Sequence, residues 1–337
     1  MKRQPPLISL LTSLLLLWAQ EASYSQSALW QKVKDLPGNV VTSIAINAHG
    51  EVFAGAFDGG IIRSTDNGNS WVRSNTGLTD TEVFSVVASP NGDVFAGTFG
   101  GGIFRSTDNG GVWTEANSGL TNTEVSSLAI SPDGNIFTGT VNGGVFYSTN
   151  SGGTWTPISL EDVFVNSIVI RSNGDIFVGT GGDGVFRSPK HGQSWKKINT
   201  GLKKTDVQCL AINADGHIFA ATNGAGVYRL NDNTETWAEI NTGLTNPNVG
   251  AVAIDPEGHV YAGTSSGIFR STNNGDTWTE VSTSLANISV RSLAINRKGE
   301  IFAGTMGGGI FRSLQPTASV TERLKSPMPH YDGNNAK

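Results

Sequence analysis

Two sequence markers that each recur seven times predict an all-β fold: a seven-bladed β-propeller whose blades are four-stranded antiparallel sheets. A tryptophan and a turn glycine each recur every 40 to 42 residues. The tryptophans are Trp30, Trp71, Trp113, Trp155, Trp195, Trp237 and Trp278. The glycines are Gly50, Gly92, Gly134, Gly174, Gly216, Gly258 and Gly299. Because both markers give the same period and the same count, we expect each repeat to form one blade.

The repeat that ends at Trp113 contains four segments of strand length. Gly92 closes a tight turn after the first segment, where glycine accepts a positive φ, and a second glycine-rich break follows at residues 100–102. No part of the repeat has helical periodicity. The expected strands cover residues 83–89, 94–98 and 103–106, and a fourth opens at the tryptophan.

The two ends of the repeat region predict how the ring closes. The last unit, residues 290–313, stops without a tryptophan strand. The first tryptophan strand, residues 30–33, stands before the first unit and has no blade of its own. We therefore expect this N-terminal strand to complete the last blade, which removes the open edge of the ring.

Residues 1–25 are typical of a secretory signal peptide. Lys2 and Arg3 supply the positive charge, and the apolar stretch at 7–18 is too short to span a bilayer comfortably. We expect cleavage near Ser25 and an exported protein, periplasmic or secreted. No later segment is a transmembrane candidate, so the sequence predicts no integral membrane segment.

Residues 26–314 are expected to form the propeller, and residues 315–337 a disordered C-terminal tail with three prolines and mixed charges. The formal net charge is −5 and no basic block follows the signal segment, so nucleic acid is not expected as a partner. Cys209 is the single cysteine and cannot form an internal disulfide. Other repeats have Ser or Ala at its position, so a small buried residue is expected there.

The turn between the third and fourth strands carries the motif Ser-x-Asp-x-Gly-x-x-Trp. It is complete at 64–71 and 106–113, and Asn replaces Asp at 148–155 and 271–278. The copy at 188–195 has Lys190 at the Asp position, and the copy ending at Trp237 keeps Asp232 but lacks the glycine. The motif resembles the Asp-box, or BNR, repeat of sialidases, xyloglucan-degrading propellers, sortilin-type receptors and photosystem assembly-factor propellers. The Gly-Leu-Thr segments at 77–79 and 119–121 also resemble propeller repeats of two-component sensors.

The resemblance implies that these motif residues are structural rather than catalytic. A short carboxylate accepts N–H bonds in the turn, glycine permits positive φ, and tryptophan covers the blade. The structural set is Asp66, Trp71, Asp108, Trp113, Asn150, Trp155, Trp195, Asp232, Trp237, Asn273 and Trp278.

An enzymatic site of the sialidase type needs three arginines that converge on one carboxylate. Six arginines take equivalent third-strand positions and are expected to lie apart around the ring, with Tyr147 in the remaining repeat. The arginines are Arg63, Arg105, Arg187, Arg229, Arg270 and Arg312. Glycoside hydrolysis generally needs two carboxylates at roughly 5 to 10 Å, and no acid here stands in a distinctive motif. The sequence therefore does not favour an enzymatic function.

Histidines offer little for metal binding. His217 and His259 follow turn glycines in neighbouring repeats, and His49 and His191 also fall in turns. Exposed turn residues are the expected outcome, so no metal site is predicted.

Departures from the repeat gather at the end of the ring where the innermost strands begin and where second strands lead into third strands. A recognition site and a simple packing role are both open for these residues, which suit a protein, a cationic ligand or a divalent ion. The candidate ligand-binding residues are Phe57, Asp58, Glu82, Phe84, Phe99, Glu124, Phe164, Asp183 and Asp206.

The sequence therefore favours a non-catalytic exported scaffold or binding propeller that recognises a protein or small ligand at the channel mouth. A glycoside hydrolase of the sialidase or xyloglucanase-like group stays open as the alternative. We expect a monomer without a cofactor, although a divalent cation at the channel mouth stays open, and a protein or carbohydrate ligand of unknown identity.

Overall fold

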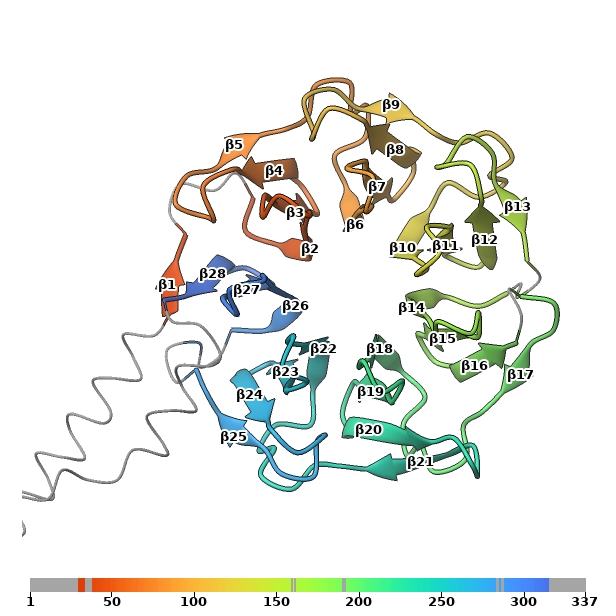
Figure 1. The fold of residues 1–337 in the computed structure, drawn as a ribbon, viewed down its shortest axis with the longest axis vertical. Coiled ribbons are helices and arrows are strands. Elements are labelled where there is room, and N and C mark those ends of the chain that lie inside the picture. Colours follow the sequence, from red (N-terminus) through yellow and green to blue (C-terminus); the bar gives the residue numbers. More distant parts are fainter. Residues whose placement is uncertain are drawn as a thin grey trace, which may run out of the picture.

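The computed structural model describes residues 30–33, 38–158, 160, 162–189, 192–282, 285 and 288–314. Their regular elements are the strands β1 to β28, arranged as seven four-stranded antiparallel sheets around a common axis (Figure 1). This confirms the expected seven-bladed β-propeller. The expected signal peptide and C-terminal tail, together with Lys190 and His191, lie outside the described residues.

The first three blades follow one another around the ring in chain order, each built from its inner strand outward (Figure 1). Blade 1 contains β2 (Val41–Ile46), β3 (Val52–Ala56), β4 (Gly60–Ser64) and β5 (Val72–Arg73). Blade 2 contains β6 (Val83–Ala88), β7 (Val94–Thr98), β8 (Gly102–Ser106) and β9 (Thr114–Glu115). Blade 3 contains β10 (Val125–Ile130), β11 (Ile136–Thr140), β12 (Val145–Ser148) and β13 (Thr156–Pro157).

The next three blades repeat the same order. Blade 4 contains β14 (Val165–Ile170), β15 (Ile176–Thr180), β16 (Gly184–Ser188) and β17 (Lys196–Lys197). Blade 5 contains β18 (Val207–Ile212), β19 (Ile218–Thr222), β20 (Gly226–Asn231) and β21 (Thr236–Glu239). Blade 6 contains β22 (Val249–Ile254), β23 (Val260–Thr264), β24 (Gly267–Ser271) and β25 (Thr279–Glu280).

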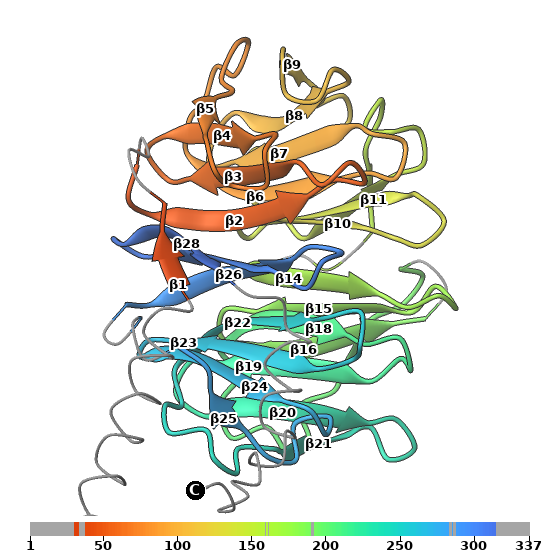
Figure 2. The same ribbon diagram turned by 60° about the vertical axis from the view of Figure 1, so that its left-hand side comes forward.

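Blade 7 joins the two ends of the described chain, as the sequence predicts. It contains β26 (Val290–Ile295), β27 (Ile301–Thr305), β28 (Gly309–Ser313) and, as its outer strand, β1 (Trp30–Lys32). β1 lies beside β28 at the rim of the ring, with Trp30 opposite Ser313 (Figure 2). The Trp30 indole donates to the Val281 carbonyl of blade 6 at 3.0 Å, so the closing strand also binds the preceding blade.

The antiparallel order gives the ring two different faces. The mouth face carries the loops between second and third strands and the segments that enter the inner strands. The turn face carries the turns between first and second strands and between third and fourth strands. Each second strand is buried along its whole length because blades pack against both of its sides, which explains why these strands are almost wholly apolar.

A ring of serine hydroxyls connects neighbouring inner strands. Each inner strand carries a bulge at its second residue, and the third residue is serine in five blades. The Ser43 hydroxyl of blade 1 accepts the Val86 N–H of blade 2 at 3.0 Å. Equivalent bonds of 2.9 to 3.0 Å join blades 2 and 3, 4 and 5, and 7 and 1. These bonds fix how each blade meets the next.

A glycine in six of the second strands allows the blades to approach closely. A Cβ added at Gly139 would lie 2.1 Å from Cγ1 of Val165 in the next blade. Blade 5 has Ala221 at this position, fully buried against blade 6. The repeated Gly-Thr ending of the second strand is therefore a packing requirement rather than a turn signal.

Tryptophans connect the blades again at the outer rim. The Trp113 indole is buried and donates to the Ser74 carbonyl of blade 1 at 2.7 Å. Five other indoles make the same bond to the preceding blade. Trp71 differs, because its indole donates to Gly68 of its own turn at 3.1 Å and is only half-buried.

We expect deletion of residues 26–35 to lower the melting temperature of the whole ring, because it removes β1 and reopens the edge of β28. Thermal unfolding followed by circular dichroism measures this. Lys32→Ala is the matched control, because that side chain is exposed in the same strand. A deletion variant that melts like the control would contradict the closure.

Trp113→Ala should cost about 3–5 kcal/mol of unfolding free energy, because a buried indole and its bond to the neighbouring blade are both lost. Val112→Ala, at an exposed neighbouring position, should change little. Urea unfolding of both variants gives the comparison, and equal effects would show that the tryptophan does not support the blade interface.

Candidate functional site

The central channel opens on the mouth face into a cavity of about 480 Å³. Its wall is formed mainly by the second and third residues of the inner strands. The second residues, from blade 1 to blade 7, are Thr42, Phe84, Ser126, Asn166, Gln208, Gly250 and Arg291. The cavity has the size of a small-ligand pocket, so it takes a side chain or a small ligand rather than a folded domain.

Several polar side chains in this wall are already used to join blades. The Thr42 hydroxyl donates to the Val83 carbonyl at 2.6 Å, and the Asn166 amide donates to the Val207 carbonyl at 2.9 Å. Ser126 makes the same kind of bond to blade 4. The polar lining is therefore largely structural, and Phe84 and Arg291 stand out from it.

A polar bridge crosses the channel on the side of blades 5 to 7. The exposed Arg291 of blade 7 donates to the Gln208 side chain of blade 5 at 2.8 Å. Gln208 in turn donates to Asp206 at 2.6 Å, and Asn223 donates to the other oxygen of that carboxylate at 3.0 Å. Blade 6 has Gly250 at the position between them, so no side chain stands between the two partners.

The opposite side of the mouth carries an aromatic cluster, defined as Phe57, Phe84 and Phe99. The Phe57 and Phe84 rings meet edge to face with centroids 5.6 Å apart, and the Phe84 and Phe99 rings stack at 5.1 Å. Phe57 is 41% exposed and Phe99 is 37% exposed, while Phe84 also lines the channel. Ring contacts of this kind hold the three side chains in one fixed surface.

The other aromatic candidate, Phe164, stands apart from this cluster. It lines the channel and its ring lies close to Gly181 in its own blade. Among the described residues no ring contact joins it to the other three phenylalanines. The structure thus brings three of the four candidate phenylalanines together.

The five candidate acids all lie on the mouth face but in different surroundings. Asp206 belongs to the polar bridge, and Asp183 forms an ion pair with Lys197 at 3.1 Å. Asp58, Glu82 and Glu124 are exposed, and the described residues give their carboxylates no hydrogen-bond or ion-pair partner. These three acids belong to blades 1 to 3 and accompany the aromatic cluster.

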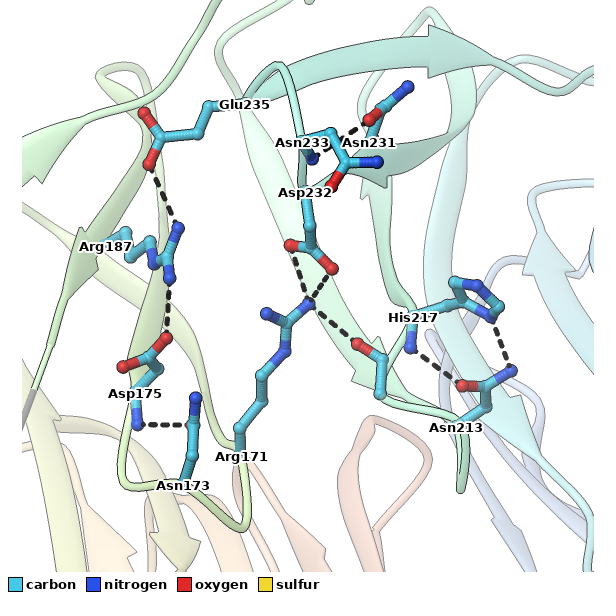
Figure 3. Close-up of polar contacts among 11 residues, drawn as sticks. Arg171, Asn173, Asp175, Arg187, Asn213, His217, Asn231, Asp232, Asn233 and Glu235 are labelled. Carbon is cyan, nitrogen blue, oxygen red and sulfur yellow. Dashed lines mark hydrogen bonds and ion pairs between the residues drawn. The ribbon is translucent and has the colours of Figure 1, made fainter.

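The repeated arginines lie at the turn-face end of their blades. Ion pairs with acids are formed there by Arg63, Arg105, Arg187, Arg229 and Arg312, and Arg270 contacts His259. Figure 3 shows Arg187 between Asp175, at 2.7 Å, and Glu235, at 3.0 Å. Arg63 and Arg105 pair with acids of their own blades at 2.6 Å. Equivalent placement separates the guanidinium groups around the ring, as the sequence predicts, so they do not form a common carboxylate site.

Blade 5 departs from the turn motif. Both carboxylate oxygens of Asp232 accept hydrogen bonds from the Arg171 guanidinium of blade 4, at 2.8 and 2.9 Å (Figure 3). Asp232 therefore does not close its own turn. Arg171 also donates to the Gly216 carbonyl at 2.7 Å. Without the motif glycine, β20 and β21 extend into a longer hairpin. Asp232 is therefore structural through an inter-blade ion pair rather than through the motif turn.

The motif turns of blades 1, 2, 3 and 6 share one hydrogen-bond pattern. In blade 1, the Ser64 hydroxyl donates to Asp66 at 2.8 Å and accepts the Gly68 N–H at 2.7 Å, while the Ser70 N–H donates to the same carboxylate at 2.8 Å. Hydrogen bonds from Ser70 lower the pKa of Asp66 from 3.8 to about 2. Asn150 and Asn273 accept the equivalent N–H bonds at 2.9 Å, so an amide serves the turn as well.

The carboxyl groups with shifted pKa values lie away from the mouth cavity. The pKa of Asp66, Asp108, Glu235 and Glu239 is lowered in each case, by hydrogen bonds to neighbouring groups. A glycosidase acid needs a raised pKa, so none of these four fits that role.

Two histidines differ from the expectation of exposed turn residues. His217 and His259 are half-buried, because each side chain packs against the polar residue that opens its turn. Asp255, Glu257 and His259 have ligand atoms within 4.8 Å of one another. The Arg270 guanidinium lies 3.0 Å from Nδ1 of His259, where its charge opposes a bound cation. The residues present therefore fit an ion-pair cluster better than a metal centre. His49 is exposed, as expected.

Cys209 borders the channel and is half-buried, whereas the sequence predicted a buried residue. It replaces the serine of the inner-strand ring, and its thiol donates weakly to the Val252 carbonyl at 3.7 Å. Desolvation raises the pKa of the thiol, which keeps it neutral and poorly nucleophilic.

A closed ring of seven blades with one asymmetric mouth defines the class of protein: a seven-bladed β-propeller with its candidate site at the end of the central channel. Solved structures confirm this fold class. The extracellular domain of a protein described as a one-component system from B. thetaiotaomicron has a TM-score of 0.70 and 18% identity, over 85% of this chain and 40% of that chain.

Two further structures have the same fold. YCF48 bound to D1 peptide has a TM-score of 0.67 and 14% identity, over 84% of this chain and 96% of that chain. The GH74 enzyme of Niastella koreensis has a TM-score of 0.68 and 22% identity, over 84% and 53% of the two chains. The chain thus spans less than two thirds of the first and the last of these proteins. At these identities the likeness establishes the fold alone.

No protein-family model and no curated protein matches the sequence. Within the described residues, no helix combines the length and the apolar character that crossing a membrane requires.

Sequence reasoning missed two features of the mouth. One is Met306, which is 51% exposed at the position of Phe57 and Phe99 in blade 7. The other is the bridge from Arg291 to Gln208, two residues 83 positions apart. A position-by-position comparison of the repeats would have found Met306, and would have shown Arg291 as the charged member of its set.

We expect acid to weaken the folded state as pH falls from about 4 to about 2, partly through Asp66. Its folded pKa lies below its ordinary value, so its contribution to stability is present above pH 3.8 and is lost as pH falls through about 2. Asp66→Asn should keep the turn and lose this part of the pH dependence. Melting temperatures of both proteins across this range provide the measurement, and parallel curves would contradict the role of the carboxylate.

Proposed function

We propose that the chain is a non-catalytic, exported binding propeller that holds a segment of a partner protein at the mouth of its channel. The observation that carries the proposal is the aromatic cluster of Phe57, Phe84 and Phe99, which is exposed beside the channel cavity. Fixed aromatic surfaces next to a cavity are typical of recognition sites, because they give contact area at a low entropic cost.

Several observations support this proposal over a hydrolase. Acids of the mouth are either bound to neighbouring side chains or exposed, and the repeated arginines bind acids at the other end of the blades. One structural neighbour is an extracellular domain and another is bound to a peptide, which agrees with export and with protein binding. The GH74 neighbour shares the fold without supplying a site.

The Phe84→Ser/Phe99→Ser variant should lose its partner while its melting temperature stays near that of the wild type. Affinity capture from the native exported fraction, with wild type and variant compared by mass spectrometry, measures the loss. Val112→Ser is the matched control, because Val112 is an exposed apolar residue on the turn face. If the double variant unfolds early with no specific loss of a partner, the phenylalanines serve packing and the proposal fails.

A further inference from the structure

Among the residues that directly follow the second strands, the apolar ones are confined to one half of the ring, whereas Phe164 of blade 4 adds an apolar side chain from the segment before an inner strand. The residue that follows each second strand is apolar in blades 7, 1, 2 and 3 and is Gly, Asn or Ser in blades 4, 5 and 6. In blade order from 7 to 6, these residues are Met306, Phe57, Phe99, Val141, Gly181, Asn223 and Ser265. Because blades 7 and 1 are neighbours in the closed ring, the four apolar positions form one continuous arc.

The arc reaches from the rim into the channel through Phe84. Its ring contacts both Phe57 and Phe99 and also lines the cavity. A side chain that fills the cavity would therefore contact an aromatic surface that continues onto the exposed rim. Exposed apolar surface of this kind on a folded domain marks an interaction site.

Negative charge accompanies the same half of the mouth. Asp58 follows Phe57 directly, Glu82 stands two residues before Phe84, and Glu124 forms a backbone bridge with Phe99. These three carboxylates are exposed and have no partner among the described residues. Asp80, also nearby, is occupied by the backbone N–H groups of Glu82 and Gly101.

Positive groups on the mouth face include Lys197 of blade 4, which pairs with Asp183, Lys203 of blade 5, which pairs with Glu239, and Lys204 in the segment that enters β18. Arg291 is held in the polar bridge with Gln208 and Asp206 on the side of blades 5 to 7. The apolar arc thus faces solvent with three acids beside it, and an uncompensated charge of one sign near an apolar surface attracts the opposite charge.

We infer that the mouth recognises a basic amphipathic segment of a partner protein: an aromatic or aliphatic side chain placed in the channel on Phe84, flanked by Lys or Arg side chains. The flanking cations lie over Asp58, Glu82 and Glu124 and contact the exposed faces of Phe57 and Phe99. This inference rests on the proposed function and adds the chemistry of the partner.

Three fluorescent nonapeptides test the inference: one with a central Phe flanked by lysines, one with the same Phe flanked by glutamates, and one with Ser in place of Phe between the lysines. Fluorescence anisotropy with the full chain should show binding of the Lys–Phe peptide, at least roughly tenfold weaker binding of the other two, and a weakening as salt is raised.

Two variants locate the binding on the proposed surface. Glu82→Gln/Glu124→Gln should weaken the Lys–Phe peptide by roughly fivefold and flatten its salt dependence, at an unchanged melting temperature. Asp183→Asn is the matched control, because that mouth acid of blade 4 is already paired with Lys197 of the same blade, and it should leave the affinity unchanged.

The outcomes separate the two proposals. Equal or tighter binding of the Glu–Phe peptide, or no effect of the two Gln substitutions, overturns the basic segment while leaving the mouth as a binding site. The basic segment is also overturned if none of the three peptides binds while the Phe84→Ser/Phe99→Ser variant loses the native partner. If the Phe84→Ser/Phe99→Ser variant still binds the native partner, the proposed function itself is wrong.

Discussion

Three residues of β1 pair with β28 and convert a row of blades into a closed ring. Every other blade closes locally, because its four strands follow one another in the chain. Blade 7 alone brings together the two ends of the described chain, with Trp30 opposite Ser313. The channel and the mouth have a defined shape only when this pairing is made, since an open row of blades would have two free ends.

The structure separates blade assembly from recognition along the axis of the ring. Serine hydroxyls at the inner strands and indoles at the rim repeat from blade to blade and hold the ring together. Arginine–acid pairs support the turn face in the same way. At the mouth the repeat is broken by Phe84 in one blade and Arg291 in another. A sevenfold scaffold thus supports a surface with no symmetry, which a single ligand requires.

The sequence was sufficient for the fold because each blade is specified locally. Trp113 and Gly92 mark positions in one blade, and their recurrence counts the blades without any knowledge of long-range contacts. The closing role of the N-terminal strand was predictable because the last unit, residues 290–313, lacks a tryptophan strand and residues 30–33 supply one. The Asp232 turn differs from the motif that predicted its role, because Leu230 and Thr234 replace the motif serine and glycine, and a longer hairpin with an ion pair to Arg171 takes the place of the motif turn.

The mouth was predictable only in outline. Repeat positions placed Phe57, Phe84 and Phe99 on one face, but whether their rings touched depended on the rotation between blades. The Arg291 bridge passes over a whole blade, and it exists because Gly250 leaves the space. No local pattern encodes such an arrangement.

The direction of the strands in blade 7 has a consequence for how the protein is presented. β1 begins and β28 ends on the turn face, so the described chain enters and leaves the ring at adjacent points behind the mouth. A tether attached at either of these points would therefore hold the propeller by its turn face, with the aromatic cluster of the mouth face directed away from the tether. Fusion to a surface or a reporter at Trp30 or Leu314 should leave that outward side unobstructed.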